Sequence, residues 1–412
     1  MAKSLFLTDK EVIELASPFL ADELSLERAL EIATAGCLSM ITEPGDRMAG
    51  ALVRCLGRDN LVSLLIGGLE TKAVIEELSA KSAVDELRAQ FGKLEETISD
   101  SRQRWLPRFS KSRLRHLFNQ SSSLGLSLVS PEDKNWPQGV NDLEDARPSI
   151  LFVEGNTNLL SGLQTSVSIV GSRTATAYGI QVTDRLVRKL AIKQRATVSG
   201  GALGIDSVVH RTSLEVGLPT VAVMAGGLDR KYPRNNSGLF EAIKTQGVLI
   251  SELPPGVAPT RWRFLQRNRI IAALSPTTVI VEAGLRSGSI RTANNALDLE
   301  RDLYAVPGSV LSGTSLGTNE LIATNKASIL NDVTAFATGT TSYPIEEFES
   351  SLAKRAKDAV REIGFPSALE IAKAAGLTRS EVEVAVTELT RTNQLIEQRT
   401  SGGELHYALN HG

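Results

Sequence analysis

Short β-branched runs alternate with helical stretches between residues 165 and 309, and this alternation constrains the fold more than any other feature of the chain. The runs are VSIVGS, ATVSGG, TVAVMAGG, VLISEL, TTVIVEAG and LYAVPGS. Most of the stretches between them carry apolar residues at helical spacing, which is typical of repeated βαβ units. We therefore predict an α/β fold with a parallel, doubly wound sheet covered by helices on both faces. Residues 150–156, ILFVEGN, are expected to add an edge strand.

The regions on either side of this alternation predict further domains. Residues 1–125 show helical spacing without alternating strand patterns, so we expect a helical N-terminal domain there. Residues 126–335 hold the predicted sheet. Residues 336–350 mix small, polar and acidic side chains and predict a linker. Residues 351–412 predict two helices followed by a short hairpin, which is the outline of a winged helix.

Charge is distributed unevenly along the chain, although the total is only −2. Residues 165–309 contain 18 Lys and Arg against 10 Asp and Glu, a local charge of +8, whereas residues 1–164 carry −6. The predicted sheet domain is therefore the basic part of the molecule, and we expect an anionic partner for it.

Several classes of protein are disfavoured by simple counts. No apolar run approaches 18 residues, and charged residues from Asp9 to Glu14 interrupt the first apolar stretch, so we expect neither a membrane span nor export, and a cytoplasmic location. Cys37 and Cys55 are the only cysteines, and two thiols cannot form a disulfide scaffold or a CxxC-type zinc site. We expect no metal and no cofactor.

Glycine-rich segments follow five of the predicted strands, at the sheet edge where ligands of such folds bind. Glycine lets a phosphate approach the backbone, and the N–H groups that open the next helix then face the anion. The alternative is that these glycines only form tight turns. We favour an anion site, whose predicted residues in the first two loops are Gly171, Ser172, Arg173, Gly200, Gly201 and Gly204.

The loop sequences narrow the kind of anion. The first turn, GSRTATAYG, lacks the GxGxxG of dinucleotide-binding folds, and no GxxxxGK[ST] phosphate loop occurs. Asp206 and His210 could bind a metal, but a capping Asp beside a buried His is the interpretation we favour. Glu252 and Glu282 could act as acid or base; we expect instead that they order basic side chains such as Arg267 and Arg269.

Two segments combine arginines with aromatic residues. Residues 260–269, TRWRFLQRNR, contain four arginines, which suits a single nucleic-acid strand whose phosphates meet cations and whose bases stack on rings. The alternative is that Trp262 and Phe264 anchor the core and the arginines are structural. Residues 101–115, SRQRWLPRFSKSRLR, fit either nucleic-acid contact or a solvated helix face, and we favour the second.

Taken in order, the motifs over residues 167–309 resemble the DNA-processing protein A (DprA/Smf) family. They are SIVGSRxxxxYG, SGGAxGIDxxxH, GGLDxxYP, GxxISExPPG, FxxRNRIIAxLS, VEAxxxSGSxxTAxxA and VPGS. The resemblance implies a non-enzymatic protein with an extended Rossmann-like domain that binds single-stranded DNA, forms a homodimer through that domain and loads the RecA recombinase during natural transformation. It places Gly171, Ser172 and Arg173 on the family's phosphate loop.

The same resemblance adds a second set of DNA-contacting residues. Arg267, Asn268 and Arg269 fall on the family's RNR motif, and Arg263 lies in the same arginine-rich stretch. Two departures stand out. Where members often have SGLARGID or SGLAKGID, this chain has Leu203 in place of the cation, and GTNELIATNKA replaces the usual GxNxLIxxGA near Asn325.

Two rival functions remain open at this point. A Rossmann-like phosphoribohydrolase would carry a PGGxGTxxE loop, but the comparable stretch EAGLRSGSIRTANNA lacks that glutamate. A duplex-DNA regulator would use the winged helix, but residues 378–392 set three glutamates against two arginines. Because acidic side chains repel phosphate, we expect the tail to contact protein or to regulate rather than to read a groove.

Overall fold

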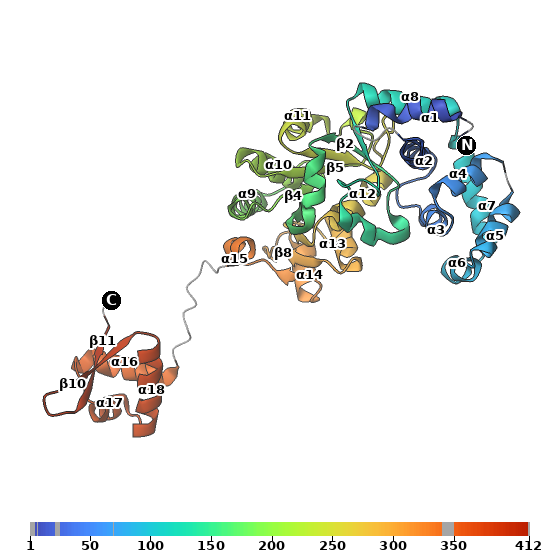
Figure 1. Cartoon of the computed structure of the whole chain (residues 1–412). Coiled ribbons are helices and arrows are strands. Elements are labelled where there is room, and N and C mark those ends of the chain that lie inside the picture. Colours follow the sequence, from blue (N-terminus) through green and yellow to red (C-terminus); the bar gives the residue numbers. More distant parts are fainter. Residues whose placement is uncertain (1–4, 6, 21–24, 69, 340–349, 411–412) are drawn as a thin grey trace. The chain divides into compact units, whose positions relative to one another are not determined.

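A computed structural model describes residues 5, 7–20, 25–68, 70–339 and 350–410 of the chain (Figure 1). Two units separate by their internal contacts, residues 1–340 and residues 341–412. Each unit is described by itself. Among the described residues, no helix is long and apolar enough to cross a membrane.

Helices fill the first part of the larger unit, as predicted. Polar residues cap their starts: Thr8 forms a capping box with Glu11, and Ser25, Asp46 and Ser110 each accept a hydrogen bond from a first-turn N–H. The helices are α1 (Asp9–Ala16), α2 (Leu26–Ile41), α3 (Arg47–Leu56), α4 (Arg58–Ile66), α5 (Thr71–Ala80), α6 (Val84–Phe91), α7 (Leu94–Trp105) and α8 (Lys111–Ser123).

A nine-stranded sheet forms the centre of the described part of this unit. Its order is β1-β2-β6-β5-β4-β3-β7-β8-β9, and every pairing from β6 to β9 is parallel. The strands are β1 (Ser127–Val129), β2 (Leu151–Gly155), β3 (Val167–Val170), β4 (Thr197–Ser199), β5 (Thr220–Met224), β6 (Val248–Ser251), β7 (Thr277–Ile280), β8 (Asp302–Ala305) and β9 (Ser328–Ile329). The predicted α/β class is confirmed.

The sheet departs from the prediction at one side. Residues 150–156 were expected to form an edge strand, but β2 lies between β1 and β6 and is antiparallel to both. The edge is the three-residue strand β1. The expectation of an edge position for β2 is therefore wrong, because the short strand β1 pairs with its outer side.

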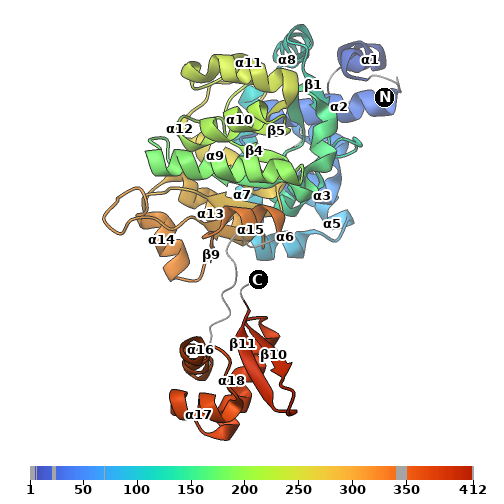
Figure 2. The ribbon, with the colours of Figure 1, turned by 90° about the vertical axis from the view of Figure 1, so that its left-hand side faces the viewer.

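Helices cover both faces of the sheet. Figure 1 shows α9, α10 and α11 on one side and α12 and α13 on the other, and Figure 2 turns the first layer toward the reader. Strands buried from both faces explain their continuous apolar runs. The helices of this region are α9 (Ala177–Ile192), α10 (Ile205–Glu215), α11 (Ser237–Gln246), α12 (Arg261–Leu274), α13 (Gly288–Asp298), α14 (Leu316–Ala323) and α15 (Val333–Thr338).

The N-terminal helices share a core with the sheet. Leu38 of α2 and Phe118 of α8 belong to the same buried cluster as Phe152 of β2, Leu249 of β6 and Phe240 of α11. The helical region is thus packed against one side of the sheet. The predicted boundary at residues 125 and 126 stays a prediction.

The described residues of the smaller unit, 350–410, form three helices and a hairpin. They are α16 (Ser351–Ile363), α17 (Ala368–Ala375), α18 (Arg379–Arg391), β10 (Leu395–Arg399) and β11 (Leu405–Leu409). Its winged-helix assignment stays a prediction. Of the predicted linker, residues up to Thr338 belong to α15, and residues 340–349 lie outside the described residues.

Candidate functional site

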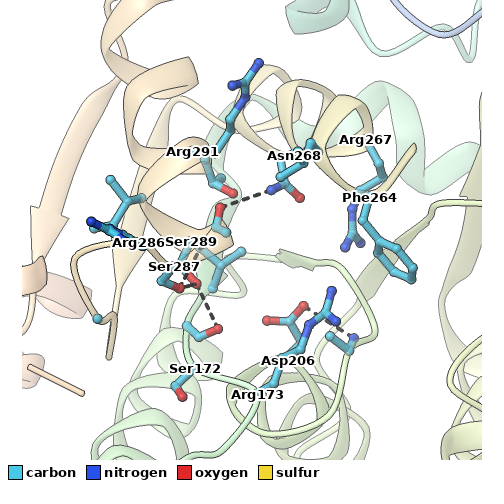
Figure 3. A pocket seen from close by; sticks show the side chains of 18 of the residues that line it. Ser172, Arg173, Asp206, Phe264, Arg267, Asn268, Arg286, Ser287, Ser289 and Arg291 are labelled. Atoms are coloured by element: carbon cyan, nitrogen blue, oxygen red, sulfur yellow. Dashed lines mark hydrogen bonds between the residues drawn. The ribbon is translucent and has the colours of Figure 1, made fainter. Parts of the chain in front are cut away.

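The strand order creates a switch point between β3 and β7. From β3 the chain passes through α9 to β4 on one side, whereas β7 pairs with β3 on the other side. Ligands of open α/β sheets bind outside the carboxyl ends of the strands at such a point. A cavity of about 1220 Å³ lies there, walled by the segments that follow β3 and β7 and by parts of α12 and α13 (Figure 3).

Arginines dominate the charge of this pocket. Asp206 is the one carboxylate among the described residues that line it. Like charges gathered in one place repel one another, so such a collection is typical of a site whose ligand is an anion. The lining arginines are Arg173, Arg261, Arg267, Arg286 and Arg291.

Four of these arginines have no acidic partner. Within the described part of the chain, no carboxylate oxygen lies within 4.0 Å of the charged groups of Arg173, Arg261, Arg286 or Arg291. Arginines outside the pocket commonly do have one, as Arg188 has with Asp184 at 3.0 Å. The cations that line the pocket are therefore available to a ligand.

The fifth arginine, Arg267, is buried and part of the pocket's framework. Its Nη1 donates to the carbonyl oxygens of Gly200 at 2.6 Å and Val223 at 2.5 Å, which follow or end neighbouring strands. Burial lowers the pKa of Arg267 to about 10, and the Asp206 carboxylate acts in the opposite direction. The guanidinium therefore stays charged at neutral pH.

Hydrogen bonds between loops hold the pocket walls together. Ser289 Oγ donates to the carbonyl oxygen of Gly171 at 2.8 Å, which joins the turn after β3 to the start of α13. Asn268 Nδ2 donates to the carbonyl oxygen of Gly288 at 3.1 Å, which joins α12 to the start of α13 (Figure 3). The N-terminus of α13, with its partial positive charge, is thus held at the pocket.

Aromatic rings lie beside the cations. The Arg173 guanidinium sits 4.9 Å from the centre of the Phe264 ring, and Tyr232 meets the same ring edge-on at 5.7 Å. Both rings line the pocket. Trp262 lies outside the pocket wall and is 53% exposed, so the interpretation of Trp262 as a core anchor is wrong. The arrangement can meet phosphate with cations and planar groups with rings.

The predicted glycines are explained by contacts within the protein. Gly171 and its neighbour Ser172 line the pocket, but Gly200, Gly201 and Gly204 do not. A Cβ on Gly200 would lie 2.1 Å from Arg267 Nη1, and one on Gly204 would lie 2.2 Å from the carbonyl oxygen of Ser172. In the second loop, glycine is thus needed for close packing of the chain on itself, and its role in ligand contact stays a prediction.

Two predicted arginines point to carboxylates. Arg263 contacts Glu43 at 3.1 Å, and Arg269 contacts Glu252 at 2.6 Å. Neither lines the pocket, whereas Arg173, Arg267 and Asn268 do. The structure thus brings together the phosphate-loop residues and half of the arginine-rich stretch. Ligand contact by Arg263 and Arg269 stays a prediction.

The acidic residues near the pocket have structural partners. Asp206 accepts hydrogen bonds from the N–H groups of Gly200 and Ala202, and burial raises its pKa. Glu282 accepts from the N–H and hydroxyl of Thr176, the cap of α9. The expectation that Glu282 orders an arginine is therefore wrong. The same expectation for Glu252 is confirmed by its contact with Arg269. No cluster of three or more metal-ligating side chains occurs among the described residues.

Three lining arginines were absent from the predicted set. Arg261 stands in the arginine-rich stretch, while Arg286 and Arg291 flank Ser287–Ser289, the cap and first turn of α13. Basic residues on both sides of a Ser-Gly-Ser turn at a strand end are a signal that could have found the last two.

Comparisons with known proteins agree on one group. A family model described as DNA recombination-mediator protein A matches residues 127–340. A DNA processing protein DprA of Mycobacterium tuberculosis is 36% identical over 297 residues, or 69% of each chain. The structure of DNA processing protein A from Streptococcus pneumoniae is 26% identical with a TM-score of 0.58, and the match covers 75% of this chain and 97% of that one. A structure of the Helicobacter pylori protein, described as showing its single-stranded DNA binding mode, is 32% identical with a TM-score of 0.48 and covers 52% and 96%.

Proposed function

Because this chain belongs to the DNA recombination-mediator protein A family, we propose that it binds single-stranded DNA in the pocket between β3 and β7. One observation carries the proposal: four arginines without acidic partners, Arg173, Arg261, Arg286 and Arg291, face one cavity. Each can neutralise a phosphate, and the start of α13 adds N–H donors for another oxygen.

A single strand suits this pocket better than a duplex. The rings of Phe264 and Tyr232 are part of the pocket lining, beside Arg173. In a duplex the bases are paired and stacked on one another, whereas a single strand can turn its bases onto protein rings. Aromatic rings beside cations therefore favour binding of single-stranded over double-stranded DNA.

The proposed role is binding rather than catalysis. The two carboxylates nearest the pocket, Asp206 and Glu282, are buried and accept hydrogen bonds from the protein's own backbone. A buried carboxylate held in this way is poorly placed to take a proton from a substrate. We therefore expect the bound strand to be released intact.

We further propose that the protein holds incoming single strands for a RecA-type recombinase during natural transformation, and that it acts as a homodimer formed through residues 126–335. The support is the family's description as a recombination mediator. Binding of the purified protein to a recombinase, measured with and without a single strand, tests the first part. Sedimentation of the protein alone tests the second.

The central experiment is a titration of labelled single and double strands of one sequence at several salt concentrations. We expect tight single-strand binding, weaker duplex binding and uncut DNA. Arg173→Ala should weaken single-strand binding and lower the log–log salt slope by about 0.7, the loss of one phosphate contact.

The matched control is Arg188→Ala, which removes an exposed arginine that is already paired with Asp184 and Glu215. It should leave both affinity and slope unchanged. An unchanged slope in Arg173→Ala would move the strand away from the turn after β3. DNA cleavage that copurifies with the wild-type protein and is lost in Glu282→Gln would show that the protein is an enzyme.

A further inference from the structure

A second basic region lies outside the pocket, where α7 meets α8. The segment from Ser101 to His116 contains six Lys and Arg and no acid. Its aromatic residues are structural: Trp105 is buried and donates from Nε1 to Asp46 at 2.9 Å, and Phe109 packs against the core. The rings therefore anchor the segment, while Arg104, Lys111, Arg113 and Arg115 are exposed.

Two guanidinium groups meet one carboxylate beside this segment, and a third arginine contacts the backbone of one of the two. Arg108, at the end of the 3₁₀ helix η3 (Leu106–Arg108), contacts Glu43 Oε1 at 2.9 Å, and Arg263 of α12 contacts the same oxygen at 3.1 Å. Arg113 of α8 donates from Nη1 to the carbonyl oxygen of Arg108 at 3.3 Å. We name Arg108, Arg113 and Arg263 the basic strip. Among the described residues, Glu43 is the one acid paired with these arginines, and it pairs with two of the three, so the basic strip carries a surplus of positive charge.

The basic strip begins where the pocket wall ends. Arg261 lines the pocket, Trp262 is exposed, and Arg263 belongs to the strip, and all three lie in the first turn of α12. The strip therefore continues the charge of the pocket across a single helical turn. An exposed ring between two groups of cations is the arrangement by which proteins hold unpaired strands.

We propose that a single strand leaving the pocket passes over Trp262 and continues along the basic strip. This inference rests on the proposed function of the pocket. The backbone of a longer strand carries a phosphate at every nucleotide, and the strip offers it further cations, the first of them in the same helical turn as Arg261 of the pocket. Short strands should fill the pocket alone, whereas longer strands should also use the strip.

Strand length therefore separates the two sites. The experiment titrates wild-type protein and Arg113→Glu with oligothymidines of about 6 and about 20 nucleotides, one length near the lower end of the site sizes of common single-strand domains and one above them. We expect Arg113→Glu to weaken binding of the longer strand at least threefold and to lower its salt slope by about 0.7 or more. Arg113→Lys keeps the charge and should restore most of the affinity.

Arg113 is a suitable position because its side chain is exposed and, among the described residues, its guanidinium donates a hydrogen bond to the carbonyl oxygen of Arg108 alone. Folding should not depend on it, and equal melting temperatures of the variants check this. Trp262→Ala gives an independent test, since it removes the ring without changing charge. This substitution should weaken binding of the longer strand more than binding of the shorter one.

The outcomes distinguish this inference from the proposed function. If Arg113→Glu and Trp262→Ala bind the longer strand as tightly as wild-type protein does, the strand does not follow the strip, and the pocket proposal stands. Equal weakening of both lengths would also overturn the inference, because the strip would then act through the pocket. If wild-type protein binds neither length, the proposed function itself is wrong.

Discussion

Substitution of Leu203 can test which path a bound DNA strand takes over the protein. Leu203 stands in the loop between β4 and α10, at the position where the family patterns SGLARGID and SGLAKGID have a cation, and it is 41% exposed. Its neighbour Ala202 lines the pocket, whereas Leu203 does not. An exposed leucine beside a residue of the pocket wall is a position where a charge can be added without removing core packing.

Leu203→Arg should therefore strengthen single-strand binding by roughly 1 kcal/mol, or about fivefold at moderate salt, with a steeper salt slope. Salt-dependent titration measures the gain, and thermal melting of the same variant checks the fold. A lower melting temperature without tighter binding would mean that Leu203 packs against another copy or segment, and would take this loop out of the DNA path.

Asn325 accounts for the second departure from the family pattern. Its φ is 55°, the left-handed region that glycine adopts most readily. Asparagine tolerates this conformation better than other residues with a Cβ, so the turn after α14 keeps its geometry without glycine. The sequence signal was correct in marking the position, but only the backbone shows why the substitution is acceptable.

Helix α12 is an example of how much of the site could be predicted from the sequence. Its composition indicated a nucleic-acid contact, but the division of its arginines between the pocket and Glu43 or Glu252 could not be read from the chain. Glu43 lies 220 residues before Arg263. Strands and helices follow from local patterns, whereas such partners depend on how distant elements pack. The antiparallel position of β2 escaped prediction for the same reason.

Two loops support each other at the start of α10, and Gly204 is where they meet. Its φ is +78°, and an added Cβ would lie 2.2 Å from the Ser172 carbonyl oxygen. The turn after β3, which carries Arg173, therefore depends on the loop after β4. A side chain at Gly204 would have to push these two loops apart.

We expect Gly204→Ala to lower the free energy of unfolding by about 2 kcal/mol or more and to weaken single-strand binding, because strain and a backbone clash act together. Gly217→Ala is the matched control: its φ is +67°, but nothing lies within 4 Å of an added Cβ. It should cost only about 1 kcal/mol of backbone strain and leave binding intact. Denaturant unfolding and single-strand titration of both variants test this expectation. If the two substitutions lowered stability and affinity equally, the contact between the loops would be disproved.

At the scale of the whole molecule, charge assigns the two units different roles. Residues 351–412 contain eight Lys and Arg and eight Asp and Glu, whereas residues 165–309 carry +8. Helix α18 exposes Glu383 and holds Glu381 in its capping box with Thr378. A neutral unit with an acidic helix adds little to phosphate binding, which agrees with a contact to protein rather than to DNA.

Removal of residues 341–412 should accordingly change single-strand affinity by less than about twofold, because the larger unit keeps all of its phosphate contacts and releases as many counterions as before. Titration of the shortened chain beside the full chain, with melting curves for both, measures this. A tenfold loss of affinity in a shortened chain that still melts cooperatively would make the smaller unit part of the binding surface.

Arg267 divides the pocket into a part that can vary and a part that cannot. Its guanidinium joins the carbonyl oxygens at two strand ends, so replacing it would disturb the sheet itself. Arg286 and Arg291 are exposed and have no acidic partner among the described residues, so they can be exchanged at little cost to folding. Over evolutionary time, or in a laboratory selection, substitutions of Arg286 and Arg291 can therefore change the preference among anionic ligands. The backbone that carries these two side chains would stay the same.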